Sequence, residues 1–413
     1  MDSKFKLTKL ERNWIFYDVA NSAFTLMVST LIPIFFNSLA ESEGVSSVDY
    51  LAYWGYSISL STLAVAIMGP ILGGICDRRG RKKPVFMGVI ALGAACCLAM
   101  GLAKSWIAFL VIFIIARIGY QLSLVIYDSM LGDVTSEERM DSVSSSGYAW
   151  GYIGSCAPFI VCLLLVLQAG KIGMTQGQAM TVAFIIVALW WILMSMPLLR
   201  SYKQVHFLEG AAHEDGLFTT LGHTLKEMIR DKQILFFLLA FFFYIDGVYT
   251  IIDMSTAYGT ALGLNSTDLL LALLVTQFVA FPSALIMGRL SRKLPSEKLI
   301  TVCITAYFCI ACFAFFLASE WQFWVLAIGV GMFQGGIQAL SRSYFTKIIP
   351  AEKSGEYFGF LDICGKGASI MGTTVMSLVS QLTGHLNYGV ASIAIFFVFG
   401  MLFFRMSVSS GKK

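Results

Sequence analysis

Two long apolar runs, at about residues 50–75 and 84–103, flank a short basic loop that decides the fold class. The loop reads Gly73-Gly74-Ile75-Cys76-Asp77-Arg78-Arg79-Gly80-Arg81-Lys82-Lys83. Each apolar run is long enough to cross the ~30 Å hydrocarbon core of a bilayer as an α-helix. Gly80 allows a tight turn between the two helices, and Gly73 allows a close approach to another helix. We therefore predict two membrane-spanning helices whose connecting charges lie at one membrane surface.

Similar apolar runs recur along the whole chain. We count twelve, at about residues 14–38, 50–75, 84–103, 106–131, 143–167, 181–199, 233–257, 268–288, 299–318, 321–341, 356–382 and 388–405. Strands of a membrane barrel would instead appear as alternating segments of about ten residues. The pattern predicts an all-α membrane protein with twelve transmembrane helices.

The composition agrees with a lipid environment. Of the 413 residues, 57% are hydrophobic and 13% are charged, and the mean hydropathy is +0.75. Soluble domains carry about 25% charged residues, so no soluble globule could bury this much apolar surface. The nine cysteines lie in or beside apolar runs, where they serve as packing residues. No basic segment stands apart from the spans, so we expect no nucleic-acid partner.

Lysine and arginine residues predict the orientation. With both termini in the cytoplasm, 25 of the 29 Lys and Arg residues fall on the cytoplasmic side, against Lys104 and Lys171 outside. Because positively charged loops remain in the cytoplasm, we predict cytoplasmic termini and a cytoplasmic loop at 200–232. In a bacterium the protein would lie in the plasma membrane. The external segments would be 40–49, 168–180 and 258–267.

The two halves of the chain show weak internal similarity. Gly73 corresponds to Gly288, Glu138 to Glu352 and Gly151 to Gly365, which indicates one duplicated unit. We therefore predict two pseudo-symmetric six-helix bundles, residues 1–199 and 233–413, joined by a cytoplasmic linker at 200–232. Within the linker, Leu217–Ile229 could form an amphipathic helix on the membrane surface.

The loop at 73–83 resembles the signature loop of the major facilitator superfamily. The matching residues are Gly73, Asp77, Arg78, Gly80 and Arg81. The resemblance implies the major facilitator fold, with Asp77 latching the two halves in the outward-open state. Chemically, Asp77 could accept hydrogen bonds from a helix N-terminus or from an arginine across the interface. We expect Arg79, Lys82 and Lys83 to act only as topology signals, and the second-half copy, with Arg292, to be altered or absent.

Further motifs resemble the vacuole-effluxer-like branch of that superfamily. They are Tyr17-Asp18-Val19-Ala20-Asn21-Ser22-Ala23-Phe24, Asp246-Gly247-Val248, Gln338-Ala339-Leu340-Ser341-Arg342-Ser343, and Gly355-Glu356-Tyr357-Phe358-Gly359-Phe360 leading to Lys366. Fungal members of the branch resemble vacuolar amino-acid exporters, and bacterial members mostly have no assigned substrate. Val19 stands where an aromatic residue is expected, which affects local packing more than function.

Ionisable residues inside the predicted spans are the functional candidates. They are Asp18, Arg117, Asp128, Asp246, Asp253, Asp362 and Lys366. A charge at mid-membrane costs ~2.5–3.5 kcal/mol on insertion scales, so each must face water, a partner or a substrate. In the implied fold, spans one, four, seven and ten line the central cavity, and five of the seven residues lie on three of these spans.

In the first half, the candidates form two stripes. Asp18 and Asn21 share one side of span one, where Asp18 either faces the cavity or stabilises the helix entry. Arg117, Gln121 and Asp128 share one face of span four. Arg117 suits a substrate carboxylate, and structural pairing is the alternative. Asp128 either faces the cavity or is hydrated at the membrane interface.

In the second half, Asp246 is the main candidate for carrying a coupling proton, with Tyr249 one turn away. The alternative is a fixed salt bridge from Asp246 to Arg117 or Lys366. Asp253 shares its face and could line the external vestibule.

Three further side chains lie four residues apart on span ten. Gln334 and Gln338 could bind substrate or form hydrogen bonds between helices. Arg342 either takes part in the same site or extends to the cytoplasmic surface. Asp362 and Lys366 form an i, i+4 pair that either meets substrate or neutralises itself.

Other functional classes find no support in the chain. The four histidines are scattered, no metal-binding or nucleophile–base pattern is readable, and we expect neither a cofactor nor an enzyme. We predict a monomeric secondary transporter in the lipid bilayer that moves a small polar organic solute by alternating access. Proton-linked export of amino-acid-like metabolites is the leading version. Facilitated diffusion, import of another metabolite class and a transporter-fold sensor remain alternatives.

Overall fold

The protein is an almost entirely helical bundle in a computed structural model that describes residues 5–209, 217–261 and 266–411. Its elements are α1 (Lys9–Ser29), α2 (Leu31–Ser42), α3 (Ser47–Cys76), α4 (Lys82–Met100), α5 (Trp106–Ser129), α6 (Leu131–Val134), α7 (Glu137–Leu167), η1 (Ala169–Ile172), α8 (Gln176–Ser201), α9 (Leu217–Arg230), α10 (Lys232–Ala261), α11 (Ser266–Leu290), α12 (Ser296–Ala314), α13 (Glu320–Ile348), η2 (Ala351–Lys353), α14 (Ser354–Thr383) and α15 (Leu386–Ser410).

The long helices have the dimensions of membrane spans. Eleven helical segments in the described residues are long and apolar enough to cross a membrane. In addition, α14 is 30 residues long and packs against α3, α10 and α15 inside the bundle. Only helices with internal hydrogen bonds satisfy their backbone in lipid. The prediction of an all-α, multi-pass membrane protein is confirmed.

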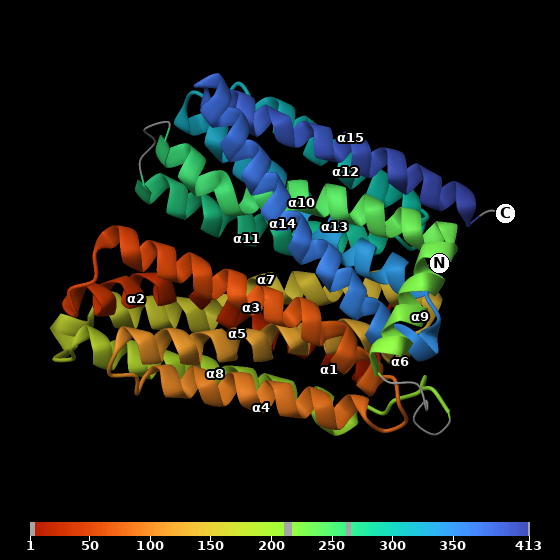
Figure 1. Ribbon diagram of the computed structural model, residues 1–413, viewed down its shortest axis with the longest axis horizontal. Coiled ribbons are helices and arrows are strands. Elements are labelled where there is room, and N and C mark those ends of the chain that lie inside the picture. Colours follow the sequence, from red (N-terminus) through yellow and green to blue (C-terminus); the bar gives the residue numbers. More distant parts are fainter. Residues whose placement is uncertain (1–4, 210–216, 262–265, 412–413) are drawn as a thin grey trace.

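The bundle has two halves that lie side by side (Figure 1). Helices α1–α8 form the lower half in this view and α10–α15 the upper half, each around its own buried apolar cluster. Across the interface α3 packs on α14, and α7 packs on α11. The two contacts are alike, because Gly73 on α3 approaches α14 closely and Gly288 on α11 approaches α7 closely.

The first predicted span differs from expectation, because it is broken into two helices. The chain leaves helical geometry at Thr30, between α1 and α2. Pro33 explains the break, since its ring has no N–H to donate and collides with the preceding turn of a continuous helix. By contrast, α10 continues without interruption through Gly247.

One end of the bundle gathers the start of α1, the end of α15 and the short helix α9 (Figure 1, right). We call it the terminal end. Helix α9 (Leu217–Arg230) lies in the connecting segment and packs against α3, α10 and α14. The loop between α3 and α4 also lies at this end, and Gly80 turns it with a positive φ of 71°.

Candidate transport site and the contacts that close one end

A buried arginine joins the two halves near the terminal end. Arg342 of α13 is 4% exposed and inserts into the first half, where Nη1 lies 2.8 Å from Asp128 Oδ1 and Nη2 lies 3.5 Å from Asp18 Oδ2. Its Nε donates to Ser144 Oγ at 2.9 Å. We call Arg342, Asp18, Asp128 and Ser144 the Arg342 cluster. Because the Arg342 side chain is buried, the alternative that it extends to the cytoplasmic surface is excluded.

Aromatic rings complete the environment of this guanidinium. Its carbon lies 4.6 Å from the ring centre of Trp14 and 4.5 Å from that of Tyr148. Tyr127 donates its hydroxyl to Asp18 Oδ2 at 2.9 Å. A planar cation stacks on such rings while it pairs with carboxylates. Asp18 is therefore part of a contact between the halves, not an isolated helix-entry acid.

The signature-loop aspartate lies on the first amides of α14. Asp77 Oδ1 accepts from Gly355 N–H at 2.8 Å, and Oδ2 accepts from Glu356 N–H at 2.9 Å. The positive end of the helix dipole favours a carboxylate there. Burial raises the pKa of Asp77 to about 7, and the Lys82 ammonium, 3.9 Å away, opposes this rise. We call Asp77, Lys82, Gly355 and Glu356 the Asp77 junction.

Lys82 corrects an expectation drawn from the sequence. It is fully buried, lies 3.7 Å from Asp133, and donates to Ser354 Oγ at 3.0 Å and to the Ser129 carbonyl at 3.3 Å. It therefore links the two halves instead of marking topology alone. The neighbouring Arg78, Arg79 and Arg81 are exposed. Nothing in a run of basic residues distinguishes the one that turns inward.

The second half has a related junction that the sequence did not reveal. Asp141 of α7 accepts from Lys347 Nζ at 2.8 Å, from Ser296 Oγ at 2.6 Å and from Ser343 Oγ at 2.5 Å. In addition, Ser142 donates to the Gly288 carbonyl at 2.6 Å. The second-half contact is thus altered, as expected from Arg292, but an acid on α7 supplies it.

The hydrogen bonds and ion pairs between the halves that have been described so far lie toward the terminal end. The connecting segment reinforces this end. Tyr202 donates to Asp133 Oδ2, and Thr224 of α9 donates to Glu356 Oε2 at 2.9 Å. A path between the halves is therefore closed at the terminal end.

Five ionisable side chains form a second group between the halves, which shares Asp128 with the Arg342 cluster. Arg117 and Asp128 come from α5, Asp253 from α10, and Asp362 and Lys366 from α14. Arg117 interacts electrostatically with Asp253 and Asp362, and Lys366 with Asp128. Asp362 and Lys366 also pair directly. We call these five residues the central charge cluster.

Arg117 is held in place by its own half. Its Nη1 donates to the Ile58 carbonyl at 3.0 Å, to Ser61 Oγ at 2.5 Å and to Thr62 Oγ1 at 2.9 Å, all on α3. With its amide oriented as an acceptor, Gln121 lies 3.0 Å from Nη2. These neutral partners leave the positive charge uncompensated inside the first half, and the carboxylates that face it come from the second half.

Asp246 lies apart from this cluster. Its side chain is 0% exposed, and Oδ1 accepts from Gly372 N–H at 2.9 Å and from Thr250 Oγ1 at 3.3 Å. Among the residues that the structure describes, Oδ2 has no hydrogen-bond partner and no cation pairs with the carboxyl. The alternative of a salt bridge to Arg117 or Lys366 is therefore not supported.

The remaining predicted residues divide between packing and the interface. Asn21 is buried and donates to the Tyr17 carbonyl within α1. Gln334 is buried inside the second half, whereas Gln338 and Tyr249 are only partly covered. The structure thus brings Arg117, Gln121, Asp128, Asp253, Asp362 and Lys366 into one region and places Asp246 and Gln334 elsewhere.

Comparison with known proteins agrees with this architecture. An "Uncharacterized MFS-type transporter YxiO" of Bacillus subtilis is 41% identical over 403 residues, covering 96% of this chain and 94% of the relative. "Autophagy-related protein 22" of Kluyveromyces lactis is 22% identical over 468 residues, covering 97% and 94%. The outward conformation of the transporter FucP superposes with a TM-score of 0.75 at 15% identity, covering 97% of both chains. The chain therefore has the major facilitator fold.

Family membership rests on nearly the whole sequence. Residues 8–139 and 132–413 match the family described as "Vacuole effluxer Atg22 like". Homologues and structural neighbours are transporters and not enzymes. The chain belongs to the Vacuole effluxer Atg22 like family of major facilitator superfamily transporters.

Proposed function

We propose that this transporter exports amino-acid-like solutes by alternating access, with protons as the coupling ion. The observation that carries the proposal is the central charge cluster. It offers two cations and three carboxylates between the halves, and Asp128, Asp362 and Lys366 keep 27%, 22% and 18% of their side chains exposed. A zwitterion has one charge of each sign to pair with such a site.

The cluster is also connected to the closed end. Asp128 belongs both to the central charge cluster and to the Arg342 cluster, because Arg342 Nη1 lies 2.8 Å from its carboxylate. An ammonium group that bound Asp128 would compete with Arg342 for the same oxygens. Substrate binding would thereby weaken a contact that keeps the halves together at the terminal end, as alternating access requires.

Asp246 supplies a place for the coupling proton. An unpaired ionised carboxylate is costly to bury, whereas the protonated form is tolerated. The close approach of Gly372 on α14 fixes one carboxyl oxygen, so relative movement of α10 and α14 would change its environment. Support by analogy comes from two neighbours whose titles name a fucose:proton and a proton:xylose symporter.

The orientation that we propose places the terminal end in the cytoplasm, so that the structure faces outward. This orientation rests on the distribution of Lys and Arg. A solved bacterial homologue of ferroportin in the outward-facing state superposes with a TM-score of 0.71 at 15% identity.

The deciding experiment has two steps. A thermal-shift screen of the purified protein compares zwitterionic amino acids, organic anions, cations and sugars, since a ligand of the folded state raises its apparent stability. Proteoliposomes then measure transport of any hit with and without an imposed pH gradient. We expect zwitterions to stabilise the protein and the gradient to drive their accumulation. Stabilisation by sugars alone would refute the substrate class, and transport indifferent to pH would indicate facilitated diffusion or another coupling ion.

A further inference from the structure

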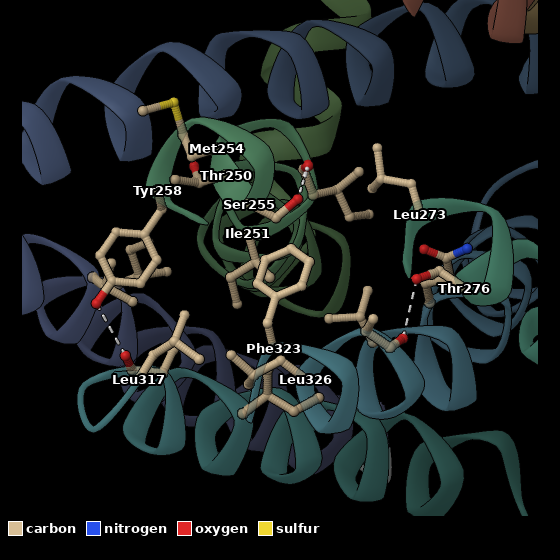
Figure 2. A pocket seen from close by; sticks show the side chains of 18 of the residues that line it. Thr250, Ile251, Met254, Ser255, Tyr258, Leu273, Thr276, Leu317, Phe323 and Leu326 are labelled. Atoms are coloured by element: carbon tan, nitrogen blue, oxygen red, sulfur yellow. Dashed lines mark hydrogen bonds between the residues drawn. The ribbon is translucent and has the colours of Figure 1, made fainter. Parts of the chain in front are cut away.

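The second half contains a pocket outside the central charge cluster and outside the contacts that close the terminal end. Its walls come from α10, α11, α12, α13, α14 and α15, and the cavity has a volume of about 100 Å³. Figure 2 shows Ile251 of α10, Leu273 of α11, and Phe323 and Leu326 of α13 around this space. A dry apolar cavity of about 150 Å³ holds a molecule of the size of benzene, so this cavity suits a small apolar group.

The pocket is chemically unlike the central charge cluster. None of its described lining residues is charged, and aliphatic and aromatic side chains predominate. A molecule with a net charge would have to shed its hydration without a counter-charge, which is strongly unfavourable. The lining therefore selects against the zwitterions that suit the central cluster.

Two amide side chains in the wall have no hydrogen-bond partner among the residues that the structure describes. Gln334 is 4% exposed and forms no hydrogen bond with any residue that the structure describes. In the same part of the chain, Gln277 Oε1 is buried without a donor. The pocket's other polar groups are already engaged, as with Thr276, which donates to the Ala272 and Ala327 carbonyls. Buried polar groups normally have partners, so these two amides point to a ligand with a matching polar group.

We propose that this pocket is a second ligand site, which takes an uncharged molecule with an apolar body and one hydroxyl or amide group. The apolar walls enclose the body, and Gln277 and Gln334 exchange hydrogen bonds with the polar group. Thr250 lines the same pocket and donates to Asp246, so a single hydroxyl separates this site from the buried acid.

The test is photolabelling of the full-length protein in lipid nanodiscs with trifluoromethyl-diazirinyl benzyl alcohol. This probe has an apolar ring and one hydroxyl, and mass spectrometry of peptides locates the label. We expect saturable labelling on α10, α11 and α13. The corresponding benzoate, which differs by its charge, should leave the pocket unlabelled. The readout does not involve transport, so failure of the transport assay would not affect it.

Matched variants make the test specific. Leu326→Trp fills the pocket and should remove at least about nine-tenths of the saturable label. Val325→Trp places the same ring on the adjacent residue, which is 48% exposed and outside the described lining, and should label as the wild type does. Gln334→Leu removes one amide and should raise the half-saturating concentration about fivefold to tenfold.

Three results would overturn the proposal. They are labelling that rises linearly without saturation, equal labelling of Leu326→Trp and wild type, and equal labelling by the benzoate. If Leu326→Trp does not yield folded protein by size-exclusion chromatography, Gln334→Leu decides, and unchanged half-saturation in that variant would refute the site.

Discussion

Single residues decide the electrostatics of this protein, and Arg117 shows how. The sequence places a cation in mid-span, and the structure adds that α3 holds the guanidinium through the Ile58 carbonyl, Ser61 and Thr62. These neutral partners fix its position without cancelling its charge. A fixed cation of this kind suits recognition of a carboxylate.

We predict that Arg117→Lys weakens the binding of carboxylate-bearing solutes at least about tenfold, because lysine keeps the charge but loses the planar fork. Thermal-shift titration of the hit solute measures the effect. Arg405→Lys, at an exposed position on α15, is the matched control and should bind normally. Normal transport by Arg117→Lys would exclude a bidentate substrate contact, and failure of Arg117→Ala to insert would indicate a structural role.

We predict that Asp246→Asn abolishes accumulation driven by a pH gradient yet retains counterflow exchange, because asparagine imitates the protonated carboxyl permanently. Proteoliposome transport in both modes measures this. Asp49→Asn, an exposed acid in the first turn of α3, is the control, and Asp253→Asn tests the other acid of α10. Gradient-driven accumulation that survives in Asp246→Asn and is lost in Asp253→Asn would move the coupling role to Asp253.

At the scale of helices, two glycines allow α3 and α14 to touch. A Cβ atom on Gly355 would lie 2.5 Å from the Gly73 carbonyl oxygen and 2.8 Å from Asp77 Oδ1. Such distances are shorter than a van der Waals contact, so any residue larger than glycine at this position would push the two helices apart. The amides that bind Asp77 belong to this same stretch, which couples helix packing to the Asp77 junction.

We predict that Gly355→Ala shifts the resting population toward the form open at the terminal end and destabilises the closed form by about 1–3 kcal/mol. Spin-label distances across each end of the bundle measure the shift. Gly88→Ala on α4 is the matched control, because a Cβ there meets nothing within 4 Å. An unchanged distance distribution in Gly355→Ala would show that this contact does not hold the closed form.

We predict the same direction of shift for Asp77→Asn. Asparagine offers one acceptor oxygen, so its amide group would face the Glu356 N–H, at a cost of roughly 1.5–3 kcal/mol. The turnover number at saturating substrate should change more than the substrate affinity. Asp49→Asn, an exposed acid at the other end of α3, serves as the control. Wild-type turnover and accessibility in Asp77→Asn would leave Asp77 as a topology element.

At the scale of the whole molecule, the distribution of Lys and Arg predicts the membrane orientation. We predict that Ser46→Cys, introduced into a variant without the nine native cysteines, reacts with an impermeant maleimide only from outside the cell. Val205→Cys, in the exposed connecting segment, should react only from the cytoplasmic side. Labelling of the residue-46 probe only from the cytoplasm would show that the topology is the opposite of the predicted one, so that the structure faces inward.

The distribution of contacts between the two halves is compatible with the rigid-body movement that we propose. Each half has its own buried apolar cluster, and the bonds between them are concentrated in the Arg342 cluster, the Asp77 junction and the contacts of Asp141. Breaking a few polar contacts would open this end without exposing either core. This arrangement fits rigid-body alternating access.

Much of the fold follows from the sequence by itself. In lipid, a long apolar segment must satisfy its own backbone as a helix, so length and composition predicted the spans. Charged loops and the duplicated signature predicted the hairpin at Asp77 and the paired halves. Mid-span charges identified Arg117, Asp246 and the Asp362–Lys366 pair as candidates, because a charge there is costly unless it has a partner.

Only the tertiary structure decided which side chains meet. Asp18 and Arg342 are 324 residues apart in the chain, and Lys82 looks like any other basic residue of its loop. The physical reason is that lipid and protein interior are both apolar. The hydrophobic pattern of a membrane helix therefore does not tell its inner face from its outer face. The pocket around Gln277 and Gln334 likewise exists only where six helices converge, and no local pattern records it.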